Sequence, residues 1–270
     1  MKRVLVAIDA RQVNINVLDF ACYIAKLTHS KLTGVFLDTE VQEPVSQPVY
    51  SEPGAAVIGE KQELFGESVR VFRDACTNRG ANCSVFNEIT ILPADIIKET
   101  RFAELLIVDP DMSFKDRKEE IPSSFIREVL VKSECPVVLA PFSFYGIDEI
   151  VFAYDDGAAA AYAIKQFTYL FPEFTGKKIT VLQVDETGEN LFKGKDKMGE
   201  LLQLHYQGTG FRLLQGKAAD ELFGYLLGKK NIFVVMGAFG RGMISGLVRH
   251  STAELLIKTI NLPVFIAHHK

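Results

Sequence analysis

Several features are missing from this 270-residue sequence, and each absence removes a class of protein. No run of about 18 apolar residues occurs, so the sequence predicts no membrane-spanning helix. The N-terminal MKRVLVAID enters a strand-like run at once and lacks the apolar core and cleavage site of a signal peptide. A net charge of −4 gives no basic footprint for nucleic acid. We therefore expect a cytoplasmic protein with no nucleic-acid or membrane partner.

Cysteine and histidine are also sparse, and neither is spaced for a metal site. The four cysteines form no C-x-x-C pair, and buried thiols in a reducing compartment are the simplest interpretation. Cys76 and Cys83 flank an expected helix-to-strand turn and are at most an incidental pair. The five histidines show no metal-ligand spacing. There is no G-x-S-x-G elbow and no Walker lysine, so we expect no metal and assign no catalytic residue.

What the sequence does contain is an internal repeat. Each half opens on a strand-like run that ends in an acid, KRVLVAIDA at Asp9 and DEIVFAYDDG at Asp155. Each half closes on a similar motif, CPVVLAP (135–141) and LPVFIAH (262–268). Between them, apolar runs alternate with segments of helical periodicity. One structural unit has therefore been duplicated within the chain.

Alternation of strands and helices in each half predicts the fold class. We expect an α/β protein of two tandem, doubly wound domains, each with a five-stranded parallel sheet in the order 3-2-1-4-5. The stretch PFSFYGIDE (141–149) marks the boundary and gives domains 1–143 and 147–270. The first half is longer, and we interpret the Pro-, Ser- and Gly-rich residues 39–60 as an extended loop.

Ligands of open doubly wound sheets lie where the strand order reverses, at the carboxyl ends of strands 1 and 4. In the second half these ends are residues 154–157 and 236–240, and the second begins the stretch MGAFGRGMISGLVRHST (236–252). Glycine lets backbone N–H groups approach an anion, and Ser251 and Thr252 precede a helical run whose N-terminus favours negative charge. A simpler interpretation stays open: the glycines only end a strand and Ser251 is an ordinary N-cap.

The same stretch resembles the phosphate-binding pattern of the universal stress protein family: Gly, two residues, Gly, nine residues, then Gly followed by Ser or Thr. The resemblance is to the tandem form and covers nearly the whole chain. It implies Rossmann-like, adenine nucleotide alpha hydrolase-like domains, with ATP or another adenine nucleotide, and Mg²⁺, in the second. The cofactor-binding residues that it implies are Asp155, Val184, Met236, Gly237, Gly240, Ser251 and Thr252.

Two departures from that pattern lie in the second half. His250 stands where nucleotide-binding members have glycine. Its side chain either obstructs the phosphates or contributes a donor near them, and both interpretations stay open. Asp155-Asp156-Gly157 replaces the usual Asp-Gly-Ser, and the added acid would repel phosphate or hold a cation.

The first half departs further. Its loop reads DPDMSFKDRKEEIPSS, with no glycine and an excess of acids, and Pro110 aligns with Gly237. Proline has no N–H to donate. We therefore expect no anion site there and interpret the first domain as a partner for the second. The last strand of each half would expose an apolar edge, so we expect the two to pair within the chain as a pseudo-dimer, with a homodimer as the alternative.

Three hypotheses of different classes compete with nucleotide binding by a stress-response protein. The main alternative is a nucleotide-free scaffold that pairs with proteins through its sheet edges. A second is slow nucleotide hydrolysis, and a third is another small acidic or lipidic ligand near residues 39–60. The amphipathic stretch 192–206 favours none of them, since we expect its apolar residues to face the core.

Overall fold

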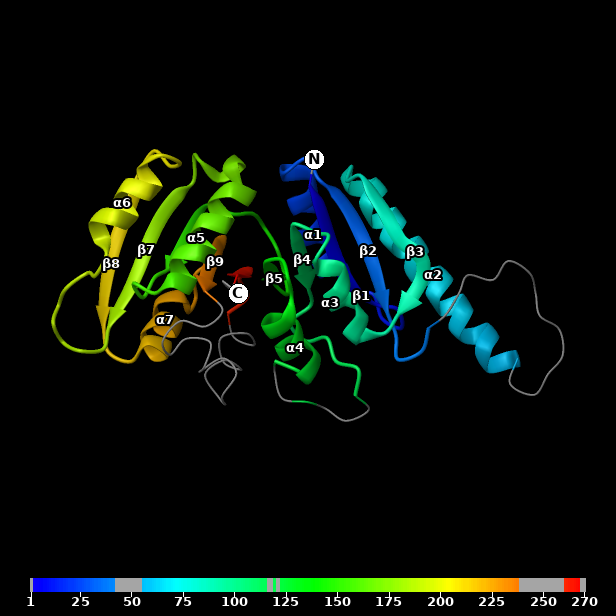
Figure 1. The fold of residues 1–270 in the computed structure, drawn as a ribbon. Coiled ribbons are helices and arrows are strands. Elements are labelled where there is room, and N and C mark those ends of the chain that lie inside the picture. Colours follow the sequence, from blue (N-terminus) through cyan, green and yellow to red (C-terminus); the bar gives the residue numbers. More distant parts are fainter. Residues whose placement is uncertain (1, 42–54, 116–118, 120–121, 238–259, 268–270) are drawn as a thin grey trace.

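The computed structural model describes residues 2–41, 55–115, 119, 122–237 and 260–267, with the backbone alone for 55–60 (Figure 1). The strands of the first half are β1 (Arg3–Asp9), β2 (Lys31–Leu37), β3 (Cys83–Ile91), β4 (Leu105–Val108) and β5 (Val137–Leu139). Those of the second half are β6 (Glu149–Ala153), β7 (Lys178–Asp185), β8 (Thr209–Gln215), β9 (Ile232–Gly237) and β10 (Val264–Ala267).

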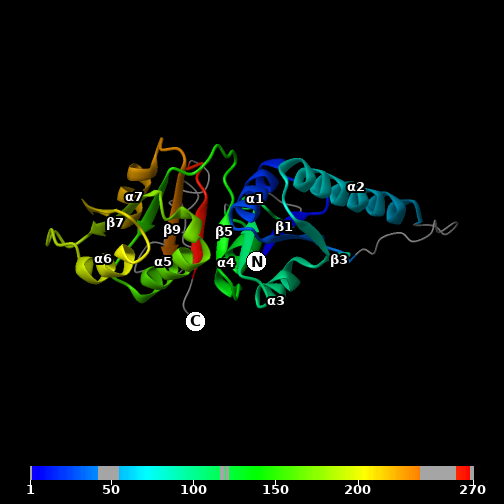
Figure 2. The same ribbon diagram turned by 90° about the horizontal axis from the view of Figure 1, so that it is seen from above.

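The ten described strands join one sheet in the order β3-β2-β1-β4-β5-β10-β9-β6-β7-β8. Within each half the strands are parallel and the order is 3-2-1-4-5, as predicted. The halves meet where β10 pairs antiparallel with β5, with Phe265 opposite Val138 (Figures 1 and 2). This pairing confirms the expectation that the last strands of the two halves pair within the chain, so that neither apolar strand edge is left open.

Helices cover both faces of the sheet, as the doubly wound fold requires (Figure 2). One face is packed by α1 (Ile15–Leu27), α2 (Ala55–Arg79), α5 (Ala158–Leu170) and α6 (Lys195–Gln203). The other is packed by α3 (Ile96–Thr100), α4 (Ser124–Lys132) and α7 (Ala218–Leu226), and the short 3-10 turns η1 (Pro93–Asp95) and η2 (Pro172–Phe174) complete the described elements. Among the described helices none is long and apolar enough to cross a membrane.

Two details of the sequence interpretation change or gain support. The expected loop 39–60 is wrong at its end, because helix α2 already begins at Ala55. The residues AAVIGEKQE that open this helix are mostly good helix formers, and the Pro- and Ser-rich part before them masked that signal. The amphipathic stretch 192–206 contains α6, which buries Met198 and Leu202 in the core, as expected.

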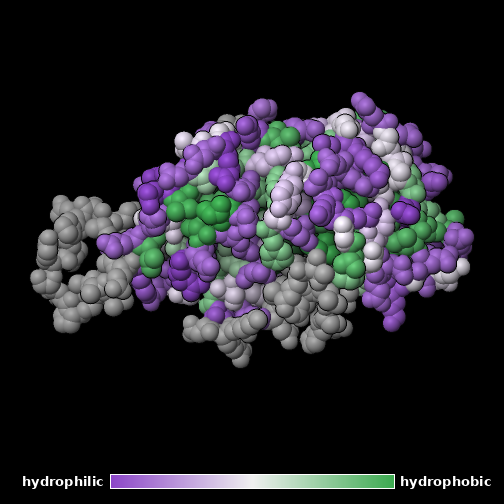
Figure 3. All heavy atoms as spheres, turned by 180° about the vertical axis from the view of Figure 1, so that it is seen from behind, coloured by the Kyte–Doolittle hydropathy of each residue, from purple (hydrophilic) through white to green (hydrophobic). Residues whose placement is uncertain are grey.

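The core is continuous across the two halves. Phe20 of α1 lies 5.2 Å from Phe144 of the connecting segment and 6.1 Å from Phe233 of β9, measured between ring centroids. In the same core Cys76 meets Cys22, with 3.8 Å between the two sulfur atoms and both side chains buried as free thiols. Sequence spacing suggested Cys83 as the neighbour of Cys76, but Cys22 of α1 also contacts it. Outside the core, hydrophilic residues dominate the face in Figure 3, with apolar ones in separate groups.

Candidate functional site

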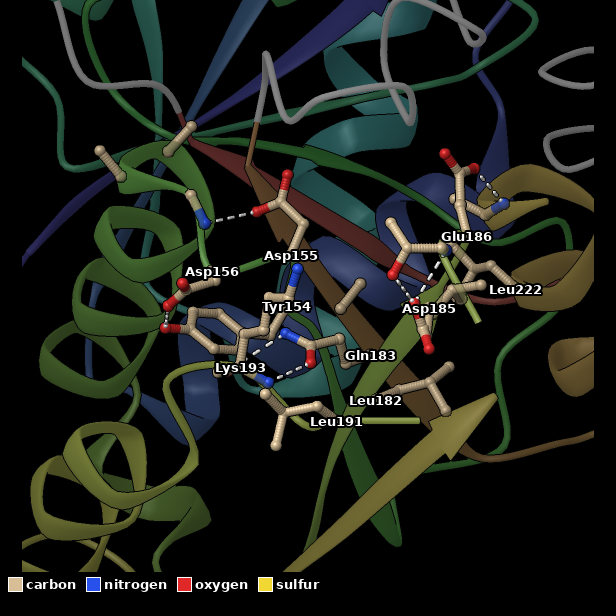
Figure 4. A pocket seen from close by; sticks show the side chains of 17 residues that line it. Tyr154, Asp155, Asp156, Leu182, Gln183, Asp185, Glu186, Leu191, Lys193 and Leu222 are labelled. Atoms are coloured by element: carbon tan, nitrogen blue, oxygen red, sulfur yellow. Dashed lines mark hydrogen bonds between the residues drawn. The ribbon is translucent and has the colours of Figure 1, made fainter. Parts of the chain in front are cut away.

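A cavity of about 590 Å³ lies at the carboxyl ends of β6 and β7, beside the point where the strand order of the second half reverses (Figure 4). Its apolar floor is made by Ala153, Leu182 and Leu222, all of which are buried. Two of the predicted site residues, Asp155 and Val184, line it. The cavity thus lies on the β7 side of β6, next to the predicted point between β6 and β9, and these two residues come together in it.

Asp155 is fixed by the turn that leads into α5. Its Oδ1 atom accepts a hydrogen bond of 2.9 Å from the backbone N–H of Gly157, the residue before the helix. A Cβ atom on Gly157 would lie 2.7 Å from that same oxygen, so any larger residue here would displace the Asp155 carboxylate from this bond. The sequence Asp-Asp-Gly thus places a carboxylate at the mouth of the cavity on a rigid turn.

Met236 and Gly237 end β9 and are buried, and neither is among the residues that line the cavity. A Cβ atom on Gly237 would lie 2.5 Å from the backbone carbon of Ala159. Glycine here allows β9 to pack closely against the start of α5, whatever else the residue does. The remaining predicted residues Gly240, Ser251 and Thr252, together with His250, lie outside the described part of the chain.

Asp156 has a partner that the sequence did not reveal. Its Oδ1 atom accepts a hydrogen bond of 2.9 Å from the Tyr154 hydroxyl, and its backbone has a φ of 60°, in the left-handed region. Burial, and then the hydrogen bond and charge of Asp156, raise the pKa of Tyr154, so the phenol stays a donor at neutral pH. Figure 4 shows the two side chains facing each other at one side of the cavity.

The segment after β7, residues 186–194, is held in place by two side chains of that strand. Gln183 is 5% exposed, and its side-chain amide bonds both backbone groups of Lys193: Nε2 donates to the carbonyl at 3.2 Å and Oε1 accepts from the N–H at 2.7 Å. Asp185 accepts from the N–H groups of Thr187 at 2.9 Å and Asn190 at 2.7 Å. The only signal for Gln183 in the sequence was one amide within an apolar strand, ITVLQVD.

Charge at this end of the cavity is predominantly acidic. The hydroxyl and N–H of Thr187, together with Asn190, lower the pKa of Asp185, which therefore stays ionised. Glu186 accepts from the N–H of Ala218 at 2.7 Å, at the start of α7. Among the described residues that line the cavity, the one basic side chain is Lys193, whose ammonium is paired with Glu189 at 3.0 Å. Such surroundings favour neutral groups that donate hydrogen bonds and disfavour phosphate.

Comparison with known proteins rests on structure alone, since no protein-family model and no curated protein matches the sequence. A universal stress protein from Archaeoglobus fulgidus DSM 4304 matches with a TM-score of 0.70 and 17% identity, over 99% of this chain and 98% of that one. A putative universal stress protein from Pseudomonas aeruginosa UCBPP-PA14 matches with a TM-score of 0.58 and 16% identity, over 99% and 93%. The chain has the universal stress protein fold. Both matches span the full tandem arrangement.

The first half of this universal stress protein fold has a cavity of about 500 Å³ at the corresponding strand ends, but its polar groups are engaged with one another. The Arg11 guanidinium donates to both carboxylate oxygens of Asp9, at 2.9 and 2.8 Å. Asn14 donates to Asp109 at 2.7 Å. The strand-1 acid that corresponds to Asp155 is therefore bound by an arginine two residues later.

A carboxylate of the first half lies at the start of α4, where the repeat aligns Ser124 with Ser251. Glu119 accepts hydrogen bonds from the Ser113 hydroxyl at 2.6 Å and the Ser124 N–H at 3.2 Å, and pairs with Lys115 at 3.0 Å. Burial acts to raise its pKa, but these donors outweigh it and lower the pKa to about 2. The negative charge at this helix start comes from the protein itself.

Proposed function

We propose that the second half of this protein binds an adenine nucleotide and that the chain is a stress-response protein of the universal stress type. The observation that carries the proposal is the cavity beside the reversal point of the strand order, lined by both Asp155 and Val184. The glycine-rich stretch 236–252 continues from β9, the neighbour of β6 in the sheet. A nucleoside and its phosphates would thus meet two adjacent strand ends.

The described residues suit the nucleoside part. Buried Leu182 and Leu222 offer an apolar surface to a flat base, and the Asp155 carboxylate is an acceptor for ribose hydroxyls. The acids at this end oppose a polyphosphate. We therefore assign the phosphates, and the Mg²⁺ that would accompany them, to the stretch 236–252, which begins at Met236. Its proposed binding residues are Gly237, Gly240, Ser251 and Thr252.

The rest of the proposal concerns the whole chain. Residues 1–143 and 147–270 form two domains, of which the first is a partner without a nucleotide of its own, as the Arg11–Asp9 pair and the engaged Glu119 support. The protein acts in the cytoplasm by binding, with hydrolysis at most slow. Asp155, Asp185 and Glu186 line the nucleoside end.

Titration calorimetry with ATP and Mg²⁺ tests the proposal. We expect one site per chain in the wild type and at least tenfold weaker binding in Gly240→Val, because a branched side chain would block the approach of backbone N–H groups to phosphate. Gly224→Ala is the matched control, since nothing lies within 4 Å of the added carbon there. Absence of binding in the wild type, with no nucleotide retained in native mass spectrometry, would favour the nucleotide-free scaffold instead.

A further inference from the structure

The segment 186–194, which we call the cover, borders the cavity of the second half. The residues on either side of Leu191 are bonded to or packed against the neighbouring strands. Asn190 donates its N–H to Asp185, and Lys193 is bonded twice by Gln183. Phe192 stacks on Tyr154 with ring centroids 6.4 Å apart and meets Phe211 edge-on at 5.2 Å. These hydrogen bonds and ring contacts hold the cover in position.

Its far end is fixed as well. Gly194 has a φ of 69°, which favours glycine, and a Cβ atom there would displace the side-chain oxygens of Tyr154 and Asp156. The hydrogen bond between Tyr154 and Asp156 therefore has a second consequence, since it forms the surface on which the cover ends. Asp156 belongs to this attachment, which accounts for an acid at a position where the related pattern has glycine.

Leu191 is the exception within the cover. Its neighbours on both sides are bonded or stacked, whereas the Leu191 side chain lines the cavity and remains 58% exposed. An exposed leucine on a rigid segment loses no backbone freedom when a ligand covers it, so its burial contributes fully to affinity. The buried Leu182 and Leu222 line the same cavity.

We propose that Leu191 is a specificity-determining residue that contacts the base of a bound nucleoside, and that Gln183 positions it by holding the cover. This proposal rests on the proposed function, and it names the base as the part of the nucleotide that the cavity recognises. Leu182, Leu191 and Leu222 offer apolar surface to a flat base, whereas a free phosphate or a sugar phosphate would meet the acids of the same cavity. Selection at this end is therefore for the base.

Calorimetry with three probes, adenosine, ATP and inorganic tripolyphosphate, tests the contact. We expect Leu191→Ala to weaken adenosine and ATP by the same factor, about tenfold, and to leave tripolyphosphate unchanged. Leu204→Ala is the control, because Leu204 is 79% exposed in the same half and does not line the cavity. Equal affinities of Leu191→Ala and the wild type for adenosine would overturn the proposal and leave nucleotide binding intact.

The positioning role of Gln183 has a readout that needs no ligand. In the wild type the Lys193 amide should be protected from hydrogen exchange, and Gln183→Ala should remove that protection while leaving amides of β6 and β9 protected. Gln183→Ala should also weaken adenosine, and the double variant with Leu191→Ala should lose less than the product of the two single losses. A rapidly exchanging wild-type Lys193 amide, or fully multiplicative losses, would contradict the coupling. If the wild type bound neither adenosine nor ATP, both the function and the base contact would fall.

Discussion

Phe20 and Phe233 belong to different halves of the chain and share one core, edge to face with an interplanar angle of 78°. Both side chains are fully buried. Truncation in Phe20→Ala removes contacts to both halves at once, and we expect a loss of about 3–5 kcal/mol in the free energy of unfolding. Urea unfolding should show the loss in a single transition. Phe102→Ala, at a site 67% exposed, should change the free energy by about 0.5 kcal/mol or less. Two separate transitions, one of them unaffected by Phe20→Ala, would show that the halves fold independently.

Gly237 should be intolerant of even one added carbon. The new Cβ in Gly237→Ala would press on the backbone of Ala159 and Ala160, and backbone cannot move aside as a flexible side chain can. We expect the overpacking to cost about 1–3 kcal/mol of stability. Gly224→Ala lies within α7, where the added carbon meets nothing within 4 Å, and should raise stability by up to about 1 kcal/mol. Thermal unfolding of the two variants measures the expected loss of stability in one and the expected gain in the other. A Gly237→Ala variant as stable as the wild type would refute the close packing of β9 on α5.

The repeat pattern sufficed for the strand order, because buried parallel strands are recognisable as apolar runs and few crossover topologies are allowed. It also led to Asp155, at the end of strand 1 of the second half, whereas Val184 came from the family resemblance. Side-chain partners were beyond its reach. Nothing in ITVLQVD indicates that Gln183 bonds a backbone ten residues later, and Asp156 looked like a free acid until Tyr154 was placed beside it. Such contacts depend on loop conformation, which no periodic pattern encodes.

Glu119 should make the stability of the first half sensitive to acid. Its folded-state pKa of about 2 lies below the ordinary value of 4.5, so ionised Glu119 stabilises the fold above about pH 4.5. That contribution is lost as the pH falls from about 4.5 towards 2, because protonation removes the acceptor for Ser113, Ser124 and Lys115. The difference in unfolding free energy between the wild type and Glu119→Gln should therefore be constant from pH 7 to 5 and shrink below pH 4. Glu128→Gln, which removes an exposed i,i+4 pair with Lys132, should cost less than about 0.5 kcal/mol. A pH-independent difference for Glu119→Gln would contradict the ionised, bonded carboxylate.

Nucleotide binding should depend on the strand-1 acid of one half only. Asp155→Asn keeps the oxygen that accepts from Gly157, so the turn should persist, but it replaces a carboxylate by a weaker acceptor for ribose hydroxyls. We expect about tenfold weaker adenosine binding with unchanged thermal stability. Asp9→Asn is the matched change in the first half, where Arg11 already takes both carboxylate oxygens and its guanidinium lies 5.4 Å from the Phe114 ring. Because Arg11 already holds the Asp9 carboxylate, Asp9→Asn should leave adenosine affinity unchanged even if it lowers stability. Equal losses of adenosine affinity in the two variants would mean that both halves bind the nucleoside, and the assignment of the first half as a partner domain would be wrong.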